Sequence, residues 1–379
     1  MLTKIAIKNY KSLENVELTL RPLNVLVGPN NSGKSNLLDC LEWLREFMMI
    51  QGPGAIESRG GFKNLVWNGE IQRTISIELS GSLGRKSSYQ YLLEVSGGKT
   101  HHSISKELFK IDDAILLEYP VSLGNYSGQY ILYNRKQERL QNGSIIRGNE
   151  PNLKYLAGIE SVPELSQFRT EIENWRFHNP VPSRMRNPVQ VRRDLRLGKE
   201  GENLSGVLHS IHSEFRDAFQ KLEEKLRSAV PEVTQLVTAL TEGGETYINL
   251  KENKLNLPIP SWAMSDGTLA LLAMLAVFYS PEPPPLVCLE EPENFLHPHL
   301  LELLGELLIN ASDRSQIMIT THSPYLLDLF KPENVIIIEK KEGKTTLQSA
   351  QNKKGIKKAL QDLGLGEFWY SGALGGVPE

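Results

Sequence analysis

Eight residues near the start of the chain constrain its fold more than any other feature. The segment GPNNSGKS, Gly28 to Ser35, follows the apolar run Leu23 to Val27, and apolar residues then recur at helical spacing from Leu37 onward. A glycine-rich loop between a buried strand and a helix directs backbone N–H groups and the positive end of the helix dipole toward one point. The order of strand, loop and helix therefore predicts a phosphate-binding loop.

Two side chains in this loop have specific expected roles. We expect the Lys34 ammonium to neutralise the β- and γ-phosphates of ATP, and the Ser35 hydroxyl to complete a Mg²⁺ shell. A chance glycine turn is the alternative, and it is disfavoured because strand, loop and helix all agree. The predicted ATP-binding residues are Gly28, Asn30, Asn31, Ser32, Gly33, Lys34, Ser35 and Asn36.

A pair of carboxylates follows the apolar run Leu286 to Leu289, which is expected to be a buried strand. Ligands of open α/β sheets bind at the carboxyl ends of the strands. Glu290 is predicted to orient Mg²⁺, directly or through water, and Glu291 to accept a proton from the attacking water. The alternative is a solvated acidic turn at a helix start.

A histidine stands at the end of another expected strand. His322 follows the apolar run Ile317 to Thr320 and precedes Ser323 and Pro324, a helix cap with proline at the first helical position. A neutral imidazole there can hydrogen-bond a γ-phosphate oxygen or the attacking water. We therefore predict that His322 senses the bound nucleotide, with a purely structural histidine as the alternative.

Taken in order, GPNNSGKS, MSDGT, LVCLEEPENFLHP and TTHSP resemble the complete motif set of ABC-type ATPases. The resemblance implies that Ser265, Asp266 and Gly267 form a signature that reaches the γ-phosphate held by a partner subunit. Two heads would then close around ATP. The implied fold class is α/β: an ABC-type ATPase head with a mixed or parallel P-loop sheet, an N-terminal antiparallel β subdomain and a mainly helical insertion.

Within ABC-type proteins, IKNYKSLENVEL and ISIEL resemble the branch of chromosome-structure, recombination-repair and overcoming-lysogenization-defect proteins. NWRF, LGKEGENL and the ending Gly366 to Pro378 resemble stand-alone AAA-family ATPases, many of them from bacterial defence loci. Two departures stand out: Glu290 occupies a position where most ABC proteins have aspartate, and the nearest candidate for a glutamine loop is Gln72, beside a strand. Only a hairpin and one helical stretch are expected after Glu339, so no Toprim nuclease domain is predicted in this chain.

The texture of the sequence divides the chain into three predicted parts. Residues 1–135 combine the phosphate loop with alternating, glycine-punctuated strands typical of an antiparallel sheet. Residues 136–256 are expected to be a mainly helical insertion, most clearly from Leu204 to Val230. Residues 257–379 alternate strands and helices and carry the signature, the carboxylates and the histidine, a pattern that predicts a parallel sheet covered by helices.

Composition restricts the compartment and the partners. The formal net charge is -3, so no global basic field indicates nucleic acid. The only two cysteines, Cys40 and Cys288, lie in apolar runs, which favours a reducing, cytoplasmic location. No secretory signal is expected, and the longest apolar segment, Leu269 to Tyr279, is too short to cross a membrane.

Some local clusters leave alternatives open. A basic stretch could contact DNA or RNA phosphates or a partner's acidic face, and a solvated loop is at least as good an explanation. His297 with His299, and His209 with His212, lack the companions of a zinc site and are read as ordinary histidines. The basic residues are Arg184, Arg186, Arg192, Arg193, Arg196 and Lys199, followed later by Lys353, Lys354, Lys357 and Lys358.

These observations together predict an ATP-hydrolysing switch that forms a homodimer or higher oligomer around ATP. The switch is expected to control a separate effector protein, such as a nuclease, in phage defence or DNA maintenance. One alternative is an ATP-dependent scaffold or DNA-binding assembly factor with negligible turnover. Another is the nucleotide-binding subunit of a transporter, which would require a membrane partner.

Overall fold

The structure, a computed structural model, describes residues 1–49, 52–84, 87–98, 102–123, 126–144, 148–353, 356, 364–372 and 374–375. The chain divides into two compact units, each built from segments that are far apart in the sequence. Unit 1 contains Met1–Trp175, Ile336–Ile356 and Gly372–Glu379, and unit 2 contains Arg176–Val335 and Lys357–Ser371.

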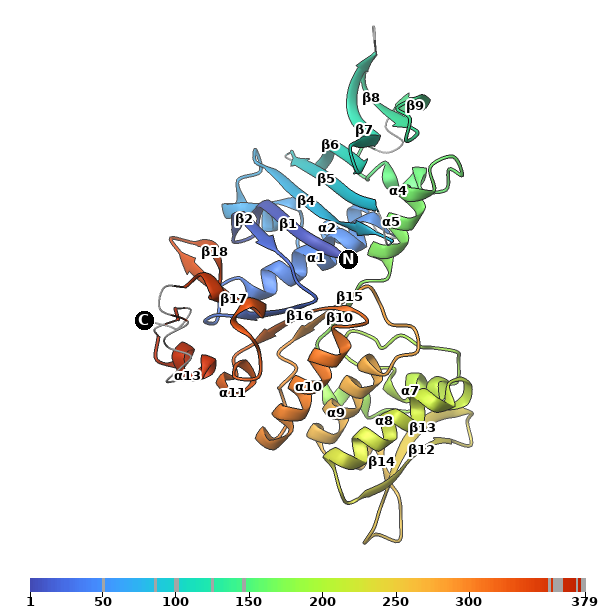
Figure 1. Ribbon diagram of the computed structural model, residues 1–379. Coiled ribbons are helices and arrows are strands. Elements are labelled where there is room, and N and C mark those ends of the chain that lie inside the picture. Colours follow the sequence, from blue (N-terminus) through green and yellow to red (C-terminus); the bar gives the residue numbers. More distant parts are fainter. Residues whose placement is uncertain are drawn as a thin grey trace. The chain divides into compact units, whose positions relative to one another are not determined.

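Across its described residues, unit 1 contains an eight-stranded antiparallel sheet in the order β2-β1-β4-β5-β6-β7-β8-β9 (Figure 1). Apolar residues alternate along β4, where Ile75, Ile77 and Leu79 are buried, so one face of the sheet lies against the core. The strands are β1 Leu2–Tyr10, β2 Leu13–Thr19, β4 Thr74–Leu83, β5 Ser87–Gly97, β6 His102–Ile111, β7 Ala114–Leu123, β8 Tyr126–Tyr133 and β9 Arg139–Ser144.

Helices of unit 1 complete this core with aromatic side chains. Trp43 of α1 stacks on Phe47 with ring centroids 5.0 Å apart and lies 5.5 Å from Tyr10 of β1. Burial of such large side chains contributes about 1.5–3 kcal/mol each, so α1 is held firmly against the first strand. The helices are α1 Lys34–Met48, α2 Pro53–Glu57, α3 Phe62–Leu65, α4 Leu153–Leu156 and α5 Pro163–Glu173.

Three further strands of unit 1 surround the start of α1. Strand β3, Leu23–Val27, is buried along its whole length and lies beside β17, Val335–Lys341. Strand β17 pairs with β18, Lys344–Ser349, as an antiparallel hairpin, which confirms the predicted turn. Glu342 and Gly343 both have positive φ there, 51° and 81°, as a tight two-residue hairpin turn requires.

Unit 2 contains two predicted parallel strands, β15 Leu286–Glu290 and β16 Gln316–Thr321. A third parallel strand, β10 Arg176–His178, pairs with β15 and was not predicted, because it lies in the segment expected to be mainly helical. Glu290 at the end of β15 is in register with Thr320 of β16, so both strands end at the same edge. The helices here are α9 Asp266–Phe278, α10 Leu301–Ala311, α11 Pro324–Leu327 and α13 Leu365–Tyr370. Among the described helices, none is both long and apolar enough to cross a membrane.

The segment that precedes α9 contains strands as well as the predicted helices (Figure 1). The helical pattern from Leu204 to Val230 is divided at Phe215, whose φ of -132° and ψ of 64° are not helical. The two resulting helices pack against a β hairpin formed by β12 and β13. The elements are α6 Pro182–Met185, β11 Val189–Gln190, α7 Leu204–Glu214, α8 Arg216–Ala229, β12 Val233–Leu240, β13 Glu245–Glu252 and β14 Ile259–Pro260.

Candidate functional site

The phosphate loop in unit 1 has the backbone that its sequence predicts. It begins where β3 ends and leads into α1, and Asn31 and Gly33 adopt positive φ of 63° and 108°. A Cβ on Gly28 would lie 2.0 Å from the Ile338 carbonyl oxygen of β17. The loop therefore needs glycine at position 28 because backbone from a neighbouring strand fills the space that a side chain would take.

Lys34 reaches back over this loop. Its ammonium donates hydrogen bonds to the carbonyl oxygens of Gly28 at 2.8 Å and Pro29 at 3.0 Å, and the residue is only 6% exposed. The next residue, Ser35, is exposed. An ammonium binds anionic oxygens more strongly than neutral carbonyl oxygens.

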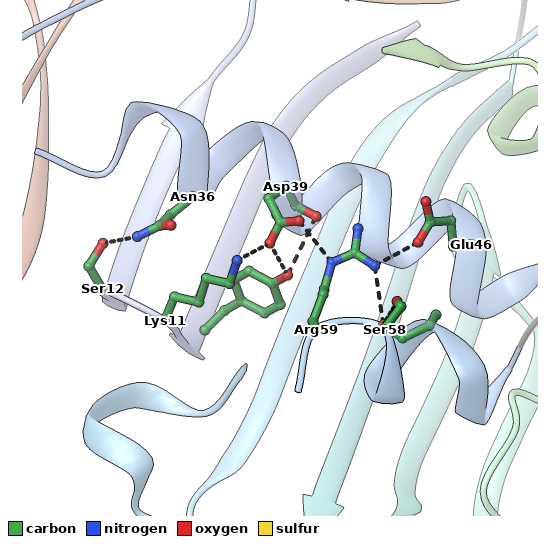
Figure 2. Close-up of polar contacts among 9 residues, drawn as sticks. Lys11, Ser12, Asn36, Asp39, Glu46, Ser58 and Arg59 are labelled. Atoms are coloured by element: carbon green, nitrogen blue, oxygen red, sulfur yellow. Dashed lines mark hydrogen bonds and ion pairs between the residues drawn. The ribbon is translucent and has the colours of Figure 1, made fainter. Parts of the chain in front are cut away.

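A chain of hydrogen bonds connects the start of α1 to the backbone of the phosphate loop. The Asn36 amide donates to Ser12 Oγ at 2.7 Å (Figure 2), Ser12 donates to Thr345 Oγ1 at 2.7 Å, and Thr345 donates to the Ser32 carbonyl at 2.8 Å. Asn36, predicted to bind ATP, is thus engaged with Ser12. Ser12 and Thr345 were not predicted, because 333 positions separate them and no local pattern links them.

Asp39 anchors α1 one turn further on (Figure 2). Its carboxylate accepts a hydrogen bond from Tyr10 at 2.6 Å, pairs with Lys11 at 2.5 Å and pairs with Arg59 at 2.8 Å. Arg59 also binds Glu46 of the same helix at 2.6 Å. These contacts tie the end of β1 and the segment after α2 to the helix that the phosphate loop begins.

The residues of the loop fit a nucleotide with Mg²⁺. The buried Ser32 hydroxyl has no hydrogen-bond partner among the described residues, while Asn30, Asn31 and Ser35 are exposed. Backbone N–H groups of a loop with this conformation can bind phosphate oxygens. Ser35 carries the hydroxyl that the sequence predicts as a Mg²⁺ ligand in this loop.

In unit 2 the structure brings Glu291 and His322 together. Glu291 Oε1 lies 3.6 Å from His322 Nε2, and Glu291 Oε2 accepts a hydrogen bond from the Asn294 amide at 3.1 Å. The Glu291 backbone has a positive φ of 44°, which is rare outside glycine. Its N–H donates to both the carbonyl and the hydroxyl of Thr320 at 3.1 Å, so the parallel pair β15 and β16 holds the strained turn.

The signature residues begin α9 of unit 2. Ser265 is the N-cap, and its hydroxyl oxygen accepts from the Thr268 N–H at 3.1 Å. Ser265 and Asp266 are exposed, so the positive end of the helix dipole faces outward. A Cβ on Gly267 would lie 2.8 Å from the Phe295 carbonyl, so the loop after Glu291 packs directly on this helix start.

Arg186 fixes the backbone that leads into the signature. Its guanidinium donates to the carbonyls of Met264 at 2.6 Å and Trp262 at 3.2 Å, and pairs with Asp266 at 2.5 Å. Sequence reasoning placed Arg186 only in a basic cluster. The contact could not have been found from the sequence, since 80 positions separate Arg186 from Asp266.

Most of the predicted basic cluster is engaged with acidic side chains. Contact with nucleic acid stays a prediction, and so does its alternative, a solvated loop. The pairs are Arg184 with Glu200, Arg186 with Asp266, Arg192 with Asp194 and Arg193 with Glu214. Lys354, Lys357 and Lys358, and part of the ending Gly366 to Pro378, lie outside the described residues.

Among the described residues, the two histidine pairs are not joined by further metal-ligating side chains, and Gln72 lies on the surface. His209 and His212 both place Nδ1 near the Thr238 hydroxyl, at 3.3 and 3.1 Å. His297 and His299 lie side by side on the surface, and Gln72 is exposed. Among the described residues, no group of three or more histidine, cysteine, aspartate or glutamate side chains could hold a metal ion.

Comparisons with known proteins agree with this geometry. Residues 23–328 match the family described as "AAA domain, putative AbiEii toxin, Type IV TA system". The OLD nuclease of Thermus scotoductus is 22% identical over 358 residues, covering 90% of this chain and 62% of the nuclease. The chain therefore spans less than two thirds of the length of that relative. The ATP/GTP phosphatase of Helicobacter pylori is 20% identical over 344 residues, which cover 87% of each protein.

A solved structure shows the same fold. The Smc head bound to the C-winged helix domain of ScpA superposes with a TM-score of 0.59 at 14% identity, covering 92% of this chain and 97% of that chain. Fold and site together define an ABC-type P-loop ATPase of the branch that includes OLD, SMC and RecF proteins. The chain belongs to the AAA-domain family of putative AbiEii toxins of type IV toxin–antitoxin systems.

Proposed function

We propose that this ATPase is a switch: two heads close around ATP, and hydrolysis separates them. The observation that carries the proposal is the pairing of Glu291 with His322 at the carboxyl ends of β15 and β16, 3.6 Å apart. A carboxylate that is held by Asn294 and faces an imidazole is suited to general base catalysis. Such a pair supports turnover over a purely assembling role.

Each residue then has a defined task in the reaction. The Lys34 ammonium leaves the carbonyls of Gly28 and Pro29 and binds the β- and γ-phosphates. Glu291 accepts the proton of the attacking water, and His322 hydrogen-bonds the γ-phosphate or that water. Mg²⁺, when bound, neutralises charge on the phosphate oxygens, and Ser35 and Glu290 are the residues that would hold it.

The dimer is proposed from the exposure of the signature. Ser265 and Asp266 are exposed where α9 begins, and the start of a helix carries the partial positive charge that binds anions. We assign this surface to the γ-phosphate held by a second copy of the chain. The signature of each copy would thereby complete the site of the other.

The downstream role is proposed from the relatives. The family description names putative toxins of toxin–antitoxin systems, and one relative is named as an OLD nuclease. We propose that the switch acts in the cytoplasm and controls a separate effector, such as a nuclease, in phage defence or DNA maintenance. Steady-state ATPase measurements with and without DNA test this role, and a flat rate near zero in both would favour the scaffold alternative.

The substitution Glu291→Gln tests the proposed base. Glutamine keeps the size of the side chain but cannot accept the proton, so single-turnover hydrolysis should fall about 100-fold or more. ATP binding should persist, and light scattering should show an ATP-bound dimer. Glu302→Gln, an exposed position on α10, serves as the matched control and should hydrolyse ATP at the wild-type rate. Full activity of Glu291→Gln would exclude Glu291 as the base.

A further inference from the structure

Glu293 lies two residues after the proposed base and contacts the segment that contains His322. Its Oε1 atom accepts a hydrogen bond from the Thr321 hydroxyl at 2.6 Å and another from the His322 backbone N–H at 2.9 Å. Thr321, the last residue of β16, is buried. One carboxyl oxygen thus fixes both the end of the strand and the first residue beyond it.

The other oxygen of Glu293 has an unusual environment. Oε2 is shut off from solvent and has no hydrogen-bond partner among the described residues. Burial raises the pKa of the Glu293 carboxyl, and the charge of Glu291 adds to this rise against the opposing hydrogen bonds from Thr321 and the His322 N–H. An unpaired buried oxygen costs stability, so the side chain is better explained by what Oε1 positions than by a contribution to the fold.

The residue next to Glu293 holds the other catalytic group. Asn294 donates from its amide to Glu291 Oε2 at 3.1 Å and from its backbone N–H to the Glu291 carbonyl at 2.9 Å. Two successive residues of one loop therefore hydrogen-bond to the two residues whose side chains lie 3.6 Å apart. Asn294 bonds to the Glu291 carboxylate, and Glu293 bonds to the His322 backbone N–H.

We propose that Glu293 is a positioning residue for ATP hydrolysis, which holds the turn from Thr321 to His322 so that the imidazole stays opposite Glu291. This inference rests on the proposed function. Without the shared acceptor, the Thr321 hydroxyl and the His322 N–H lose their common anchor and the imidazole is free to move. Because Glu293 orients a group that acts on the γ-phosphate and water, its loss lowers kcat and leaves the affinity for ATP unchanged.

Two substitutions of Glu293 separate positioning from folding. Glu293→Ala removes the acceptor and should lower kcat about tenfold or more, with the KM for ATP within about threefold of wild type. Glu293→Gln keeps an acceptor oxygen and should restore kcat to within about threefold of wild type. Glu302→Ala, a glutamate exposed on α10, is the matched control and should leave both parameters unchanged.

A double-mutant cycle tests whether Glu293 acts through His322. If it does, Glu293→Ala combined with His322→Ala should lose no more activity than His322→Ala alone. Multiplied losses in the double variant would overturn the proposal. If thermal unfolding shows that Glu293→Ala does not fold, Thr321→Val is the second variant. It removes one of the two hydrogen bonds to Glu293, together with the one that Thr321 accepts from the Ser323 N–H, and should give a smaller fall in kcat at unchanged KM.

The outcomes distinguish this inference from the proposed function. If the wild type hydrolyses ATP and Glu293→Ala does so at the same rate, the positioning role is overturned and the switch stays intact. The same holds for Thr321→Val if only that variant folds. A fall in kcat that Glu293→Gln rescues supports the role of Oε1. A wild-type chain without turnover would contradict both proposals.

Discussion

Backbone strain marks the carboxylate site at the level of single residues. A side chain at positive φ costs roughly 1–2 kcal/mol, and Glu291 pays this cost at φ 44°. The two hydrogen bonds from its N–H to Thr320 offset the strain. A costly conformation that its surroundings enforce is typical of residues that act in chemistry, and its position beside His322 is consistent with the proposed base.

Asp39 gives a prediction at the same scale. Burial opposes ionisation of its carboxyl, but hydrogen bonds from Lys11 and Tyr10 and the charge of Arg59 outweigh it and lower the pKa of Asp39. Such a carboxyl contributes stability that is present above its unfolded pKa, about 3.9, and lost as the pH falls through the folded value. Asp39→Asn should therefore lower the free energy of unfolding at pH 7 by roughly 2–3 kcal/mol.

Urea denaturation followed from neutral to acidic pH checks this sign. The gap in unfolding free energy between wild type and Asp39→Asn should be constant near neutrality and should narrow below about pH 4. Glu17→Gln breaks an exposed ion pair with Lys4 and should change stability by less than about 0.5 kcal/mol. A gap that stays constant into acid would show that the charge of Asp39 does not stabilise the chain.

The signature helix illustrates how an element depends on a distant side chain. α9 begins at Asp266, and the backbone just before it is held by Arg186 from the turn after α6. Three acceptors share one guanidinium, whose planar fork of donors suits such a site better than an ammonium. The start of α9 is therefore a rigid surface, which is what the proposed contact with a second copy requires.

Arg186→Ala should loosen this surface and weaken ATP-dependent dimerisation. The two carbonyls and Asp266 lose their shared donor, so we expect the dimer of the Glu291→Gln background to weaken about tenfold or more. Analytical ultracentrifugation with ATP measures the change. Arg184→Ala, which removes only an exposed pair with Glu200, is the matched control. Equal dimerisation by both variants would refute the bracing role of Arg186.

Sequence patterns predicted where strands and helices lie better than they predicted which distant side chains touch. Apolar spacing located β3 and the start of α1 because a buried strand and an amphipathic helix leave strong local signals. The break at Phe215 left no such signal, since apolar residues continue at helical spacing on both sides of it. Glu291 and His322 were predicted from their strand ends, whereas the roles of Ser12, Thr345 and Arg186 depend on contacts between distant segments.

The motifs are divided between the two units of the molecule. Unit 1 contains Lys34 and the phosphate loop, whereas unit 2 contains Glu291, His322 and Ser265. Each unit folds from segments that are distant in the sequence. We therefore propose that the site of ATP bound at Lys34 of one copy is completed by Ser265 of a second copy.

Mixing two inactive variants tests whether Lys34 and Ser265 of different copies act in one site. Lys34→Ala removes the phosphate cation, and Ser265→Arg blocks the signature, so each variant alone should fail to hydrolyse ATP. A mixed dimer contains one site with an intact Lys34 from one chain and an intact Ser265 from the other. We expect ATPase activity to return on mixing. A mixture as inactive as its components, from variants shown to be folded, would show that Ser265 does not complete the site of a second copy.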